Sequence, residues 1–374
     1  MKDKKTIIVF FGDFFFDARC INMALSLLHN NCSVSIICTY EKFYKYNQFN
    51  KINFYNVPLL MKNLLKYWEF HKKVVKILKN IDADVIIAAD IYSLSSVCSK
   101  RAFSDIIFDC REIYSALNAH RYKPMYKKFW SFYENYFLSY VRTVFVTAKT
   151  DYDFMKKKYC HHLQIKWSIL YNYPIDKNYS NYDTINIRTT YHIPKQHTII
   201  LYQGVLHKDR GIRQLIELVK NSQSITAIII GNGPARTDYL KLTKKNMLSK
   251  CIIFIDKIPY LELFNYTKQC DIGWCMINDR SVSYQFALPN KLFEYAYIGL
   301  PILSSNLPNT SSFILKYNLG IVIRSKNIMN YKKAVHTINQ NKRLYSNREI
   351  IKKQYTWKNQ EIKFLEILKG SIGD

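Results

Sequence analysis

The feature that most limits the possible folds of this sequence is an alternation of apolar runs and amphipathic segments that starts twice. The first alternation begins with a β-rich run at residues 6–11, followed by a helical period over 17–29 and another apolar run. The second begins at residues 198–202, after a stretch rich in Asn, Tyr, Asp and Thr. Strand–helix–strand units of this kind build parallel sheets covered by helices. The sequence therefore predicts two doubly wound α/β domains, at residues 1–175 and 176–350.

The same patterns place the individual strands. In chain order they are expected at residues 6–11, 34–38, 52–57, 84–89, 105–109, 143–147, 165–170, 198–202, 226–230, 251–255, 271–276, 301–305 and 319–323.

The composition is that of a soluble globular protein with acidic partners. Hydrophobic residues make up 48% and charged residues 22% of the 374 residues, a length that favours two domains. Lys+Arg 55 against Asp+Glu 28 gives a net charge of +27, which favours polyanions, anionic lipid surfaces and phosphorylated substrates alike. No apolar run reaches the roughly 18 residues of a membrane span. The N-terminus reads as a strand rather than a signal peptide, because Asp13 and Asp17 interrupt it.

The cysteines indicate a reducing compartment. There are nine, an odd number, and no two of them form a C-x-x-C pair. Neither a disulfide framework nor a zinc site is therefore expected. The sequence predicts a cytoplasmic protein.

Residues 287–308, ALPNKLFEYAYIGLPILSSNLP, predict a short helix that runs directly into a strand. Pro289 and Asn290 are start signals, and a Gly-Leu-Pro sequence ends the helix. Lys291 falls in the first turn and Glu294 one turn later. Helix N-termini attract anions, so this cation and carboxylate suit a phosphate and a hydroxyl-bearing sugar. The structural alternative is an amphipathic helix with two solvated charges.

Four segments in order resemble the C-terminal half of group 1 (family 4) glycosyltransferases: LYQGVLHKDRGIRQLI, AIIIGNGP, CDIGWCMIN and LPNKLFEYAYIGLPILSS. The N-terminal half is similar more loosely, through DARCINMALSLL, FDCREIY and LYNYP. The closing YTWKNQEIKFLEIL resembles the family's terminal helix. The resemblance implies the GT-B fold, with two Rossmann-like domains facing a central cleft. It also implies an acceptor-binding first domain, a nucleotide-sugar-binding second domain, and a helix at 355–370 that packs back on the first.

The resemblance places the donor diphosphate and ribose on the predicted helix. Glu294 would bind the ribose hydroxyls, because a carboxylate accepts two hydrogen bonds in a fixed fork. Lys291 would lie near the diphosphate, with Pro289, Asn290 and Leu292 in the same binding segment.

The glycine-containing loop before this helix departs from the family pattern. Relatives usually carry an Arg just after the glycine that corresponds to Gly204, where this chain has Val205. Where they carry a Lys before the next glycine, this chain has Arg210, which can still grip phosphate in a bidentate manner. Lys208 is a candidate substitute for the lost cation. The alternative for Arg210 is a solvated loop cation.

Other donor contacts follow from the resemblance with less detail. Gly231 and Gly233 of the GNGP turn would allow close approach of the backbone to a ligand, or serve the turn alone. A loop containing Ile258 would meet the base with its backbone. Relatives have an E-x7-E pair whose first Glu is replaced here by Phe286, which leaves the sugar open. The nearby polar candidates are Tyr284 and Gln285.

In the first domain, the resemblance implies that Gly12 brings the backbone close to a substrate and that Arg19 lies near the cleft. FDCREIY resembles the family's D-x-H-E sequence, with Arg111 where many relatives have His. Arg stays protonated and cannot act as a base, so Arg111 should act electrostatically. Asp109 is either a catalytic carboxylate or a cap.

Two segments combine lysines with aromatic residues: RYKPMYKKFWSFYENYF at 121–137 and LLKYWEFHKKVVKILK at 64–79. Basic aromatic helices suit anionic membrane interfaces. The alternative is a helix packed on the sheet by its aromatic face, with lysines in solvent. That alternative is expected for Trp130 and Phe137.

Together these features predict a metal-independent, retaining, hexosyltransferase-like enzyme without a cofactor. Arg210 and Lys291 would stabilise the leaving diphosphate, and the C-terminal half contains no Asp-x-Asp motif for a metal. The expected acceptor is a glycan or lipid-linked saccharide of polysaccharide or lipopolysaccharide synthesis, at the cytoplasmic face of a membrane. A sugar-nucleotide epimerase on the same fold is one alternative. A nucleic-acid-binding protein is another, but it leaves the ordered motifs unexplained, so nucleic acid is not expected as a partner.

Overall fold

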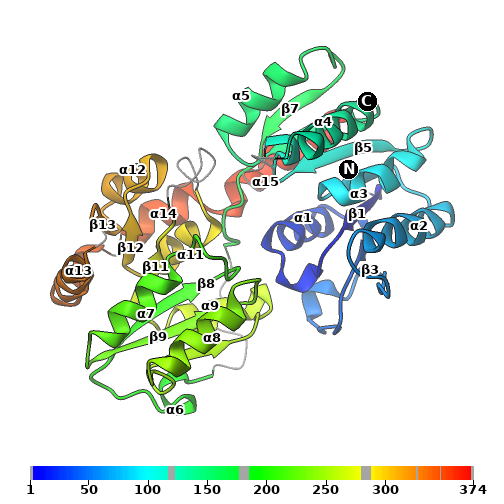
Figure 1. The fold of residues 1–374 in the computed structure, drawn as a ribbon. Helices are drawn as coiled ribbons and strands as arrows, with labels where there is room; N and C mark the ends of the chain where they lie inside the picture. Colours follow the sequence, from blue (N-terminus) through cyan, green and yellow to red (C-terminus); the bar gives the residue numbers. More distant parts are fainter. Residues whose placement is uncertain are drawn as a thin grey trace. The chain divides into compact units, whose positions relative to one another are not determined.

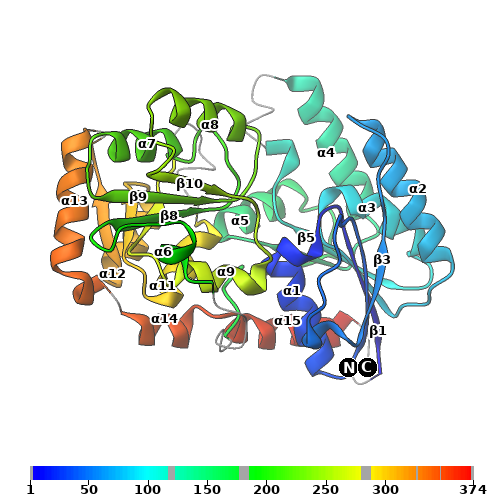
Figure 2. The same cartoon turned by 90° about the horizontal axis from the view of Figure 1, so that it is seen from below.

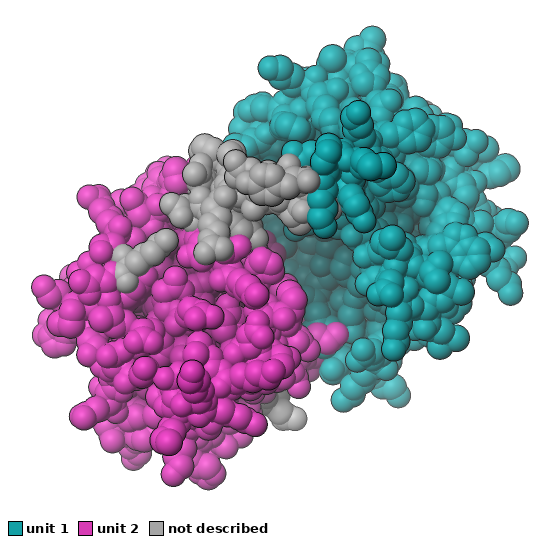
Figure 3. All heavy atoms as spheres, in the orientation of Figure 1, with its two compact units in different colours: residues 1–175, 357–374 teal, residues 176–356 magenta. Residues whose placement is uncertain are grey.

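The structure, a computed structural model, describes residues 3–116, 123–176, 185–278, 288–325, 327–345 and 347–371. The chain divides into two compact units, which Figure 3 colours separately. The first consists of Met1–Ile175 and Trp357–Asp374, and the second of Asp176–Thr356.

The first unit is built on a seven-stranded parallel sheet with the order β3-β2-β1-β4-β5-β6-β7 (Figure 1). Its strands are β1 (Lys5–Phe10), β2 (Ser33–Cys38), β3 (Ile52–Asn56), β4 (Val85–Ala88), β5 (Asp105–Cys110), β6 (Thr143–Val146) and β7 (Lys166–Ile169). Its helices are α1 (Ala18–His29), α2 (Leu65–Lys79), α3 (Ile91–Val97), α4 (Pro124–Leu138), α5 (Lys149–Lys158) and α15 (Trp357–Ser371).

Helices cover both faces of this sheet (Figure 2). On one face α2, α3, α4 and α5 share a buried core with the strands, through residues that include Phe70, Leu94, Leu138 and Met155. On the other face α1 packs against α15, whose Trp357 donates a hydrogen bond of 2.8 Å from Nε1 to a serine hydroxyl of α1. The closing helix therefore belongs to the first unit although the chain reaches it last.

The second unit contains a six-stranded parallel sheet with the order β10-β9-β8-β11-β12-β13. Its strands are β8 (Thr198–Gln203), β9 (Ile225–Ile230), β10 (Ile252–Ile255), β11 (Ile272–Cys275), β12 (Ile302–Ser305) and β13 (Gly320–Ile323). Its helices are α6 (Ile187–Thr190), α7 (Ile212–Lys220), α8 (Arg236–Lys245), α9 (Tyr260–Thr267), α11 (Asn290–Ile298), α12 (Pro308–Lys316), α13 (Ile328–Gln340) and α14 (Arg348–Gln354).

The second sheet is also covered on both faces. Helices α7, α8 and α13 share one buried core with the strands, through residues that include Leu215, Tyr239 and Val335. Helix α11 packs with α9 and α14 on the opposite face. The hydroxyl of its Tyr295 donates to the backbone oxygen of Leu201 in β8 at 3.1 Å. This bond ties α11 to the central strands.

The predicted fold class is confirmed. Each expected strand is present and agrees with the observed one to within one residue at each end. The reason is that each strand is a short run of β-branched or other apolar residues buried on both faces of a parallel sheet. All nine cysteines are free thiols. Within the described ranges, no helix is both long and apolar enough to cross a membrane.

Candidate functional site

The candidate site of the second unit lies at the carboxyl edge of its sheet, where ligands of open parallel sheets bind. Strand β8 ends at Gln203, and β9 ends one residue before the GNGP turn. Helix α11 begins at Asn290, after β11. Each of these segments brings polar groups or backbone to the same edge.

Helix α11 begins and ends as predicted. Pro289 is its N-cap, and Gly299 closes it with a left-handed φ of 77°. Lys291 and Glu294 are both only 7% exposed. The alternative of an amphipathic helix with two solvated charges is therefore wrong. Burying a cation and a carboxylate costs free energy, which indicates that the helix serves more than packing.

The carboxylate of Glu294 is held on one side by two successive side-chain hydrogen bonds. The side-chain Nε2 of Gln203 donates to Glu294 Oε2 at 2.5 Å, and Gln203 Oε1 accepts a bond of 2.9 Å from the hydroxyl of Thr267. Burial raises the pKa of Glu294 to about 7, although the Gln203 bond and the Lys291 charge act in the opposite direction. Further hydrogen-bond donors would therefore stabilise its ionised form.

Lys291 is a buried cation without a hydrogen-bond acceptor. Its Nζ lies 3.6 Å from the centroid of the Tyr202 ring, and no hydrogen-bond partner for it exists among the described residues. Burial, and then the charge of Arg210, lower the pKa of Lys291 to about 7. An anion placed beside it would relieve both effects.

Arg210 and Lys208 differ in where the loop after β8 places them. Arg210 is half-buried and close enough to act on the pKa values of Lys291 and Cys275. Lys208 is exposed and lies 3.9 Å from Asp238 of α8. The structure thus brings Arg210, Lys291 and Glu294 into one electrostatic group, and it directs Lys208 to another partner.

The two glycine-containing loops pack directly on each other. Leu206 N donates to Asn232 O at 2.9 Å, and Leu206 O accepts from Ala235 N at 3.1 Å. A side chain at Gly231 would collide with the backbone oxygen of Gly204, and one at Gly233 with Leu206. The packing of the two loops alone therefore requires glycine at both positions. Their approach to a ligand stays a prediction, as does that of Gly204, around which space is open.

The remaining donor-site candidates have mixed positions. Leu292 is fully buried, so only its backbone could meet a ligand, whereas Asn290 is exposed and Pro289 half-buried. Ile258 is half-buried in the loop before α9. Tyr284, Gln285 and Phe286 lie outside the described residues, so their predicted roles stay predictions.

The candidates of the first unit form a closed cluster of charges. Arg19 is buried and binds Asp109 from Nε at 2.8 Å, while its Nη1 donates to the backbone oxygen of Leu170 at 2.5 Å. Arg111 donates from Nε to Asp109 at 3.0 Å and from Nη1 to Asp17 at 2.6 Å. Asp17 also accepts from the backbone of α1 as its N-cap. Both arginines are thus paired with carboxylates of their own unit.

This pairing changes what these residues can do. Burial opposes the charge of Arg111, but Asp17 and Asp109 outweigh it and hold its pKa well above its usual value. Arg111 therefore stays protonated, and its electrostatic role in catalysis stays a prediction. Arg19 and Asp109 have almost no exposed surface, so neither can touch a substrate in this conformation. Their predicted roles at a substrate therefore stay predictions. Gly12 is half-buried and accepts from Thr39 through its backbone oxygen at 3.0 Å.

Sequence reasoning missed several residues of both clusters, namely Gln203, Thr267, Tyr202 and Asp17. The only available signal for Gln203 was its position at the end of a buried strand. Thr267 lies 64 positions away, at the end of α9, so nothing local connects the two.

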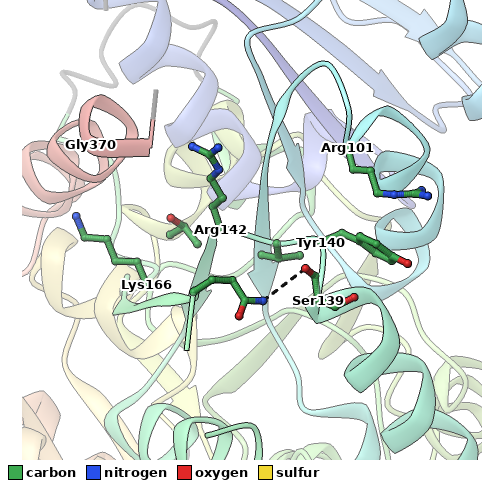
Figure 4. A pocket seen from close by; sticks show the side chains of 9 residues that line it. Arg101, Ser139, Tyr140, Arg142, Lys166 and Gly370 are labelled. Carbon is green, nitrogen blue, oxygen red and sulfur yellow. Dashed lines mark hydrogen bonds between the residues drawn. The ribbon is translucent and has the colours of Figure 1, made fainter. Parts of the chain in front are cut away.

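A hollow of about 490 Å³ lies at the opposite, amino ends of β6 and β7 (Figure 4). Three cations line it, but their side chains do not converge: Figure 4 shows Arg101, Arg142 and Lys166 directed apart. Arg142 pairs with Asp105 at 3.0 Å, and Arg101 lies over the Tyr140 ring. The cations of this hollow therefore do not act on one common position. At the carboxyl edge of the second sheet, by contrast, Arg210 is close enough to Lys291 to lower its pKa. Among the described residues, no group of three or more His, Cys, Asp or Glu could hold a metal ion.

Residues 183–357, which span nearly all of the second unit, match the family described as "Glycosyl transferases group 1". None of the curated proteins matches the sequence. Among solved structures, the chain is similar to a sucrose-phosphate synthase from Thermosynechococcus elongatus, with 12% identity, 98% of each chain covered and a TM-score of 0.73. It is also similar to Anabaena HepE in complex with UDP-glucose, with 12% identity, 98% and 100% covered and a TM-score of 0.69.

A third similar structure is WaaG, a glycosyltransferase involved in lipopolysaccharide biosynthesis. It shares 15% identity over 97% of this chain and 99% of that one, with a TM-score of 0.64. At such identities the three structures show the fold, which is GT-B. Together with the family match they confirm the resemblance drawn from the sequence.

Proposed function

We propose that this group 1 glycosyltransferase of the GT-B fold transfers a hexose, with retention, from a nucleotide-diphosphate sugar to a hydroxyl of a glycan or lipid-linked acceptor. The observation that carries the proposal is the pair formed by Lys291 and Glu294. Both are buried at the carboxyl edge of the second sheet, and each has hydrogen-bonding capacity that the described residues leave unused.

Lys291 supports a diphosphate as the ligand. Its buried ammonium lacks a hydrogen-bond acceptor among the described residues, and Arg210 adds a second positive charge close by. A diphosphate supplies the negative charge that both groups require. As the bond to the sugar breaks, charge grows on the leaving phosphate, and preorganised cations stabilise that charge most. Arg210 and Lys291 would supply this stabilisation without a metal.

Glu294 supports a ligand with neighbouring hydroxyls, such as the ribose of a nucleotide. Gln203 occupies one of its carboxylate oxygens and fixes the orientation of the group. The carboxylate retains capacity to accept bonds from two vicinal hydroxyls, which would favour its charged form. UDP sugars are the first donors to test, because the similar Anabaena structure contains UDP-glucose.

The cellular setting follows from charge and thiol chemistry. Nine free thiols suit a reducing cytoplasm, and a net charge of +27 suits an anionic surface. We therefore place the enzyme in the cytoplasm, at the inner face of a membrane, acting on a saccharide of polysaccharide or lipopolysaccharide synthesis.

A thermal-shift panel of UDP, GDP and related sugars tests the proposal with wild type, Glu294→Ala and Lys208→Ala. One nucleotide class should raise the Tm of wild type and of Lys208→Ala, but not of Glu294→Ala. A lack of any shift in wild type would contradict a nucleotide-sugar site. Product analysis without an acceptor completes the test, because a transferase leaves the sugar configuration of the donor unchanged whereas an epimerase converts it.

A further inference from the structure

Helix α4 of the first unit has two apolar faces, although a helix on the surface of a soluble domain needs only one. Its inner face includes Trp130 and Phe137, which pack against the core as the sequence predicted. Its outer face carries Met125, Phe129, Phe132 and Tyr136, which are all exposed, Phe132 by 70%. The spacing of these four residues, at i, i+4, i+7 and i+11, places them in one stripe along the helix.

The segment that leads into α2 presents a second group of apolar side chains. Leu60, Leu64, Leu65 and Trp68 are exposed, Leu60 by 85%. The backbone around Leu60 is held in place, because its N–H and that of Met61 donate to the buried carboxylate of Glu69 at 3.0 and 2.8 Å. The fold thus maintains the outward position of these side chains.

The two groups lie on the same covered face of the first sheet. Helix α3 packs against both α2 and α4 (Figures 1 and 2). A series of aromatic rings also connects the three helices. The Tyr67 ring of α2 stacks on Tyr92 of α3 at 4.2 Å, and Tyr92 lies 5.9 Å from Trp130 of α4. We call these exposed apolar side chains together the α2–α4 surface: Met125, Phe129, Phe132 and Tyr136 of α4, Leu65 and Trp68 of α2, and Leu60 and Leu64 of the segment before α2.

The charges of the α2–α4 surface have one sign. Helices α2 and α4 each contain a single acidic residue, Glu69 and Glu134. Both are buried, and Glu134 accepts bonds from Ser115 and Tyr159 within the unit. Among the residues that the structure describes on these helices and directly before them, the exposed charges are all lysines: Lys62, Lys72, Lys76, Lys79, Lys123 and Lys128.

We propose that the α2–α4 surface docks on an anionic phospholipid bilayer. Exposed Leu, Met and Phe side chains enter the acyl boundary, while lysines beside them meet negative headgroups. A second copy of the chain is disfavoured, because two surfaces that carry only positive charge repel each other. Nucleic acid would satisfy the lysines but not Leu60, Leu64, Leu65 and Met125, which cannot stack on bases in the manner of aromatic rings.

The proposal adds to the lipid-linked acceptor suggested above, but it does not need that acceptor to be correct. Vesicle binding is measured on the full chain without donor or acceptor, whereas the donor site is tested by nucleotide binding alone. A failure of one is therefore distinguishable from a failure of the other.

The experiment is co-sedimentation with vesicles of phosphatidylcholine alone and of equimolar phosphatidylcholine and phosphatidylglycerol. Wild type should bind the anionic vesicles strongly and the neutral ones weakly, with binding reduced by salt. Phe129→Ser combined with Phe132→Ser should lower the affinity by about tenfold or more, since two inserted aromatic rings are lost. The matched control is Met247→Ser combined with Leu315→Ser, two exposed apolar residues of the second unit.

Each outcome decides the proposal. Equal binding of wild type and the Phe129/Phe132 variant, or an equal loss in the control, would overturn it. So would an absence of binding to anionic vesicles. Wild-type retention of a single-stranded oligonucleotide that the same two substitutions remove would assign the surface to nucleic acid instead. Thermal unfolding and nucleotide binding of all variants should remain those of wild type, because the substituted side chains are exposed and lie outside the donor site.

Discussion

The two units place charged clusters at the carboxyl edges of their sheets, but the clusters differ in how fully they are paired. In the first unit, Arg19 and Arg111 bind Asp17 and Asp109, and the cluster is closed. In the second unit, Lys291 lacks a hydrogen-bond acceptor among the described residues, and burial raises the pKa of Glu294. Complete pairing indicates that a cluster stabilises the fold. Incomplete pairing indicates that a cluster can bind a ligand.

The largest effect is expected from Asp109→Ala, which would break the closed cluster. Removing this carboxylate leaves the buried guanidinium of Arg19 unpaired and takes one partner from Arg111. The free energy of unfolding, measured in urea, should fall by about 3–5 kcal/mol. The matched control, Asp238→Ala, removes an exposed partner of Lys208 and should cost no more than about 1 kcal/mol. Equal stability of the two variants would remove the distinction between the clusters.

Lys291→Met should have the next largest effect, but on activity rather than stability. The loss of a cation beside the leaving diphosphate should lower kcat/KM by about 10²–10³-fold. The Tm should stay the same or rise, because the variant no longer buries an ammonium without a hydrogen-bond acceptor. Lys208→Met serves as the control and should keep most of the activity. A fall in Tm together with activity would place Lys291 in the same class as Asp109.

The pH dependence of donor affinity should reflect the titration of both Lys291 and Glu294. Lys291 has a pKa of about 7, so it loses its positive charge, and the diphosphate its partner, as the pH rises above 7. Glu294 also has a pKa of about 7, so it becomes a neutral acid as the pH falls below 7. Affinity for a nucleotide sugar, measured by calorimetry, should therefore be highest near neutral pH.

Each limb of this profile has its own test. Lys291→Met should flatten the alkaline limb, and Glu294→Gln the acidic limb. A profile that keeps both limbs in both variants would mean that other groups control donor binding.

The smallest effect is expected from Arg210→Lys. This substitution introduces the Lys that the resemblance to group 1 glycosyltransferases implies at this position. The charge beside Lys291 is kept, while bidentate contact with a phosphate is lost. The KM for the donor should rise by about tenfold or less, whereas Arg210→Ala should raise it further. Equal damage by both substitutions would show that the planar guanidinium, rather than the charge, is required.

Local patterns were sufficient to predict the strands and α11. Each strand is a short apolar run between turn residues, and α11 carries its own start and stop signals in Pro289 and Gly299. These signals act through neighbouring residues, so they can be recognised from a single sequence.

Pairings between distant residues could not be predicted in this way. Arg19 meets Asp109 across 90 positions, and Gln203 meets Glu294 across 91. Both depend on the order of the strands, which brings separate chain segments to one edge. The family resemblance predicts Arg19 near the cleft and Asp109 as either a catalytic carboxylate or a cap, and only the structure shows that the two bind each other.

The chain passes between the two units at two points, and the position of these points determines how the units could be separated. The chain leaves the first unit after Ile175 and re-enters it at Trp357, whose backbone N–H donates to Pro174 O at 2.8 Å. The exit and the return are thus adjacent, and the second unit is one uninterrupted insertion between them. A gene segment for residues 176–356 could therefore be exchanged for that of a relative without interrupting the chain of the first unit, helices α2 and α4 included.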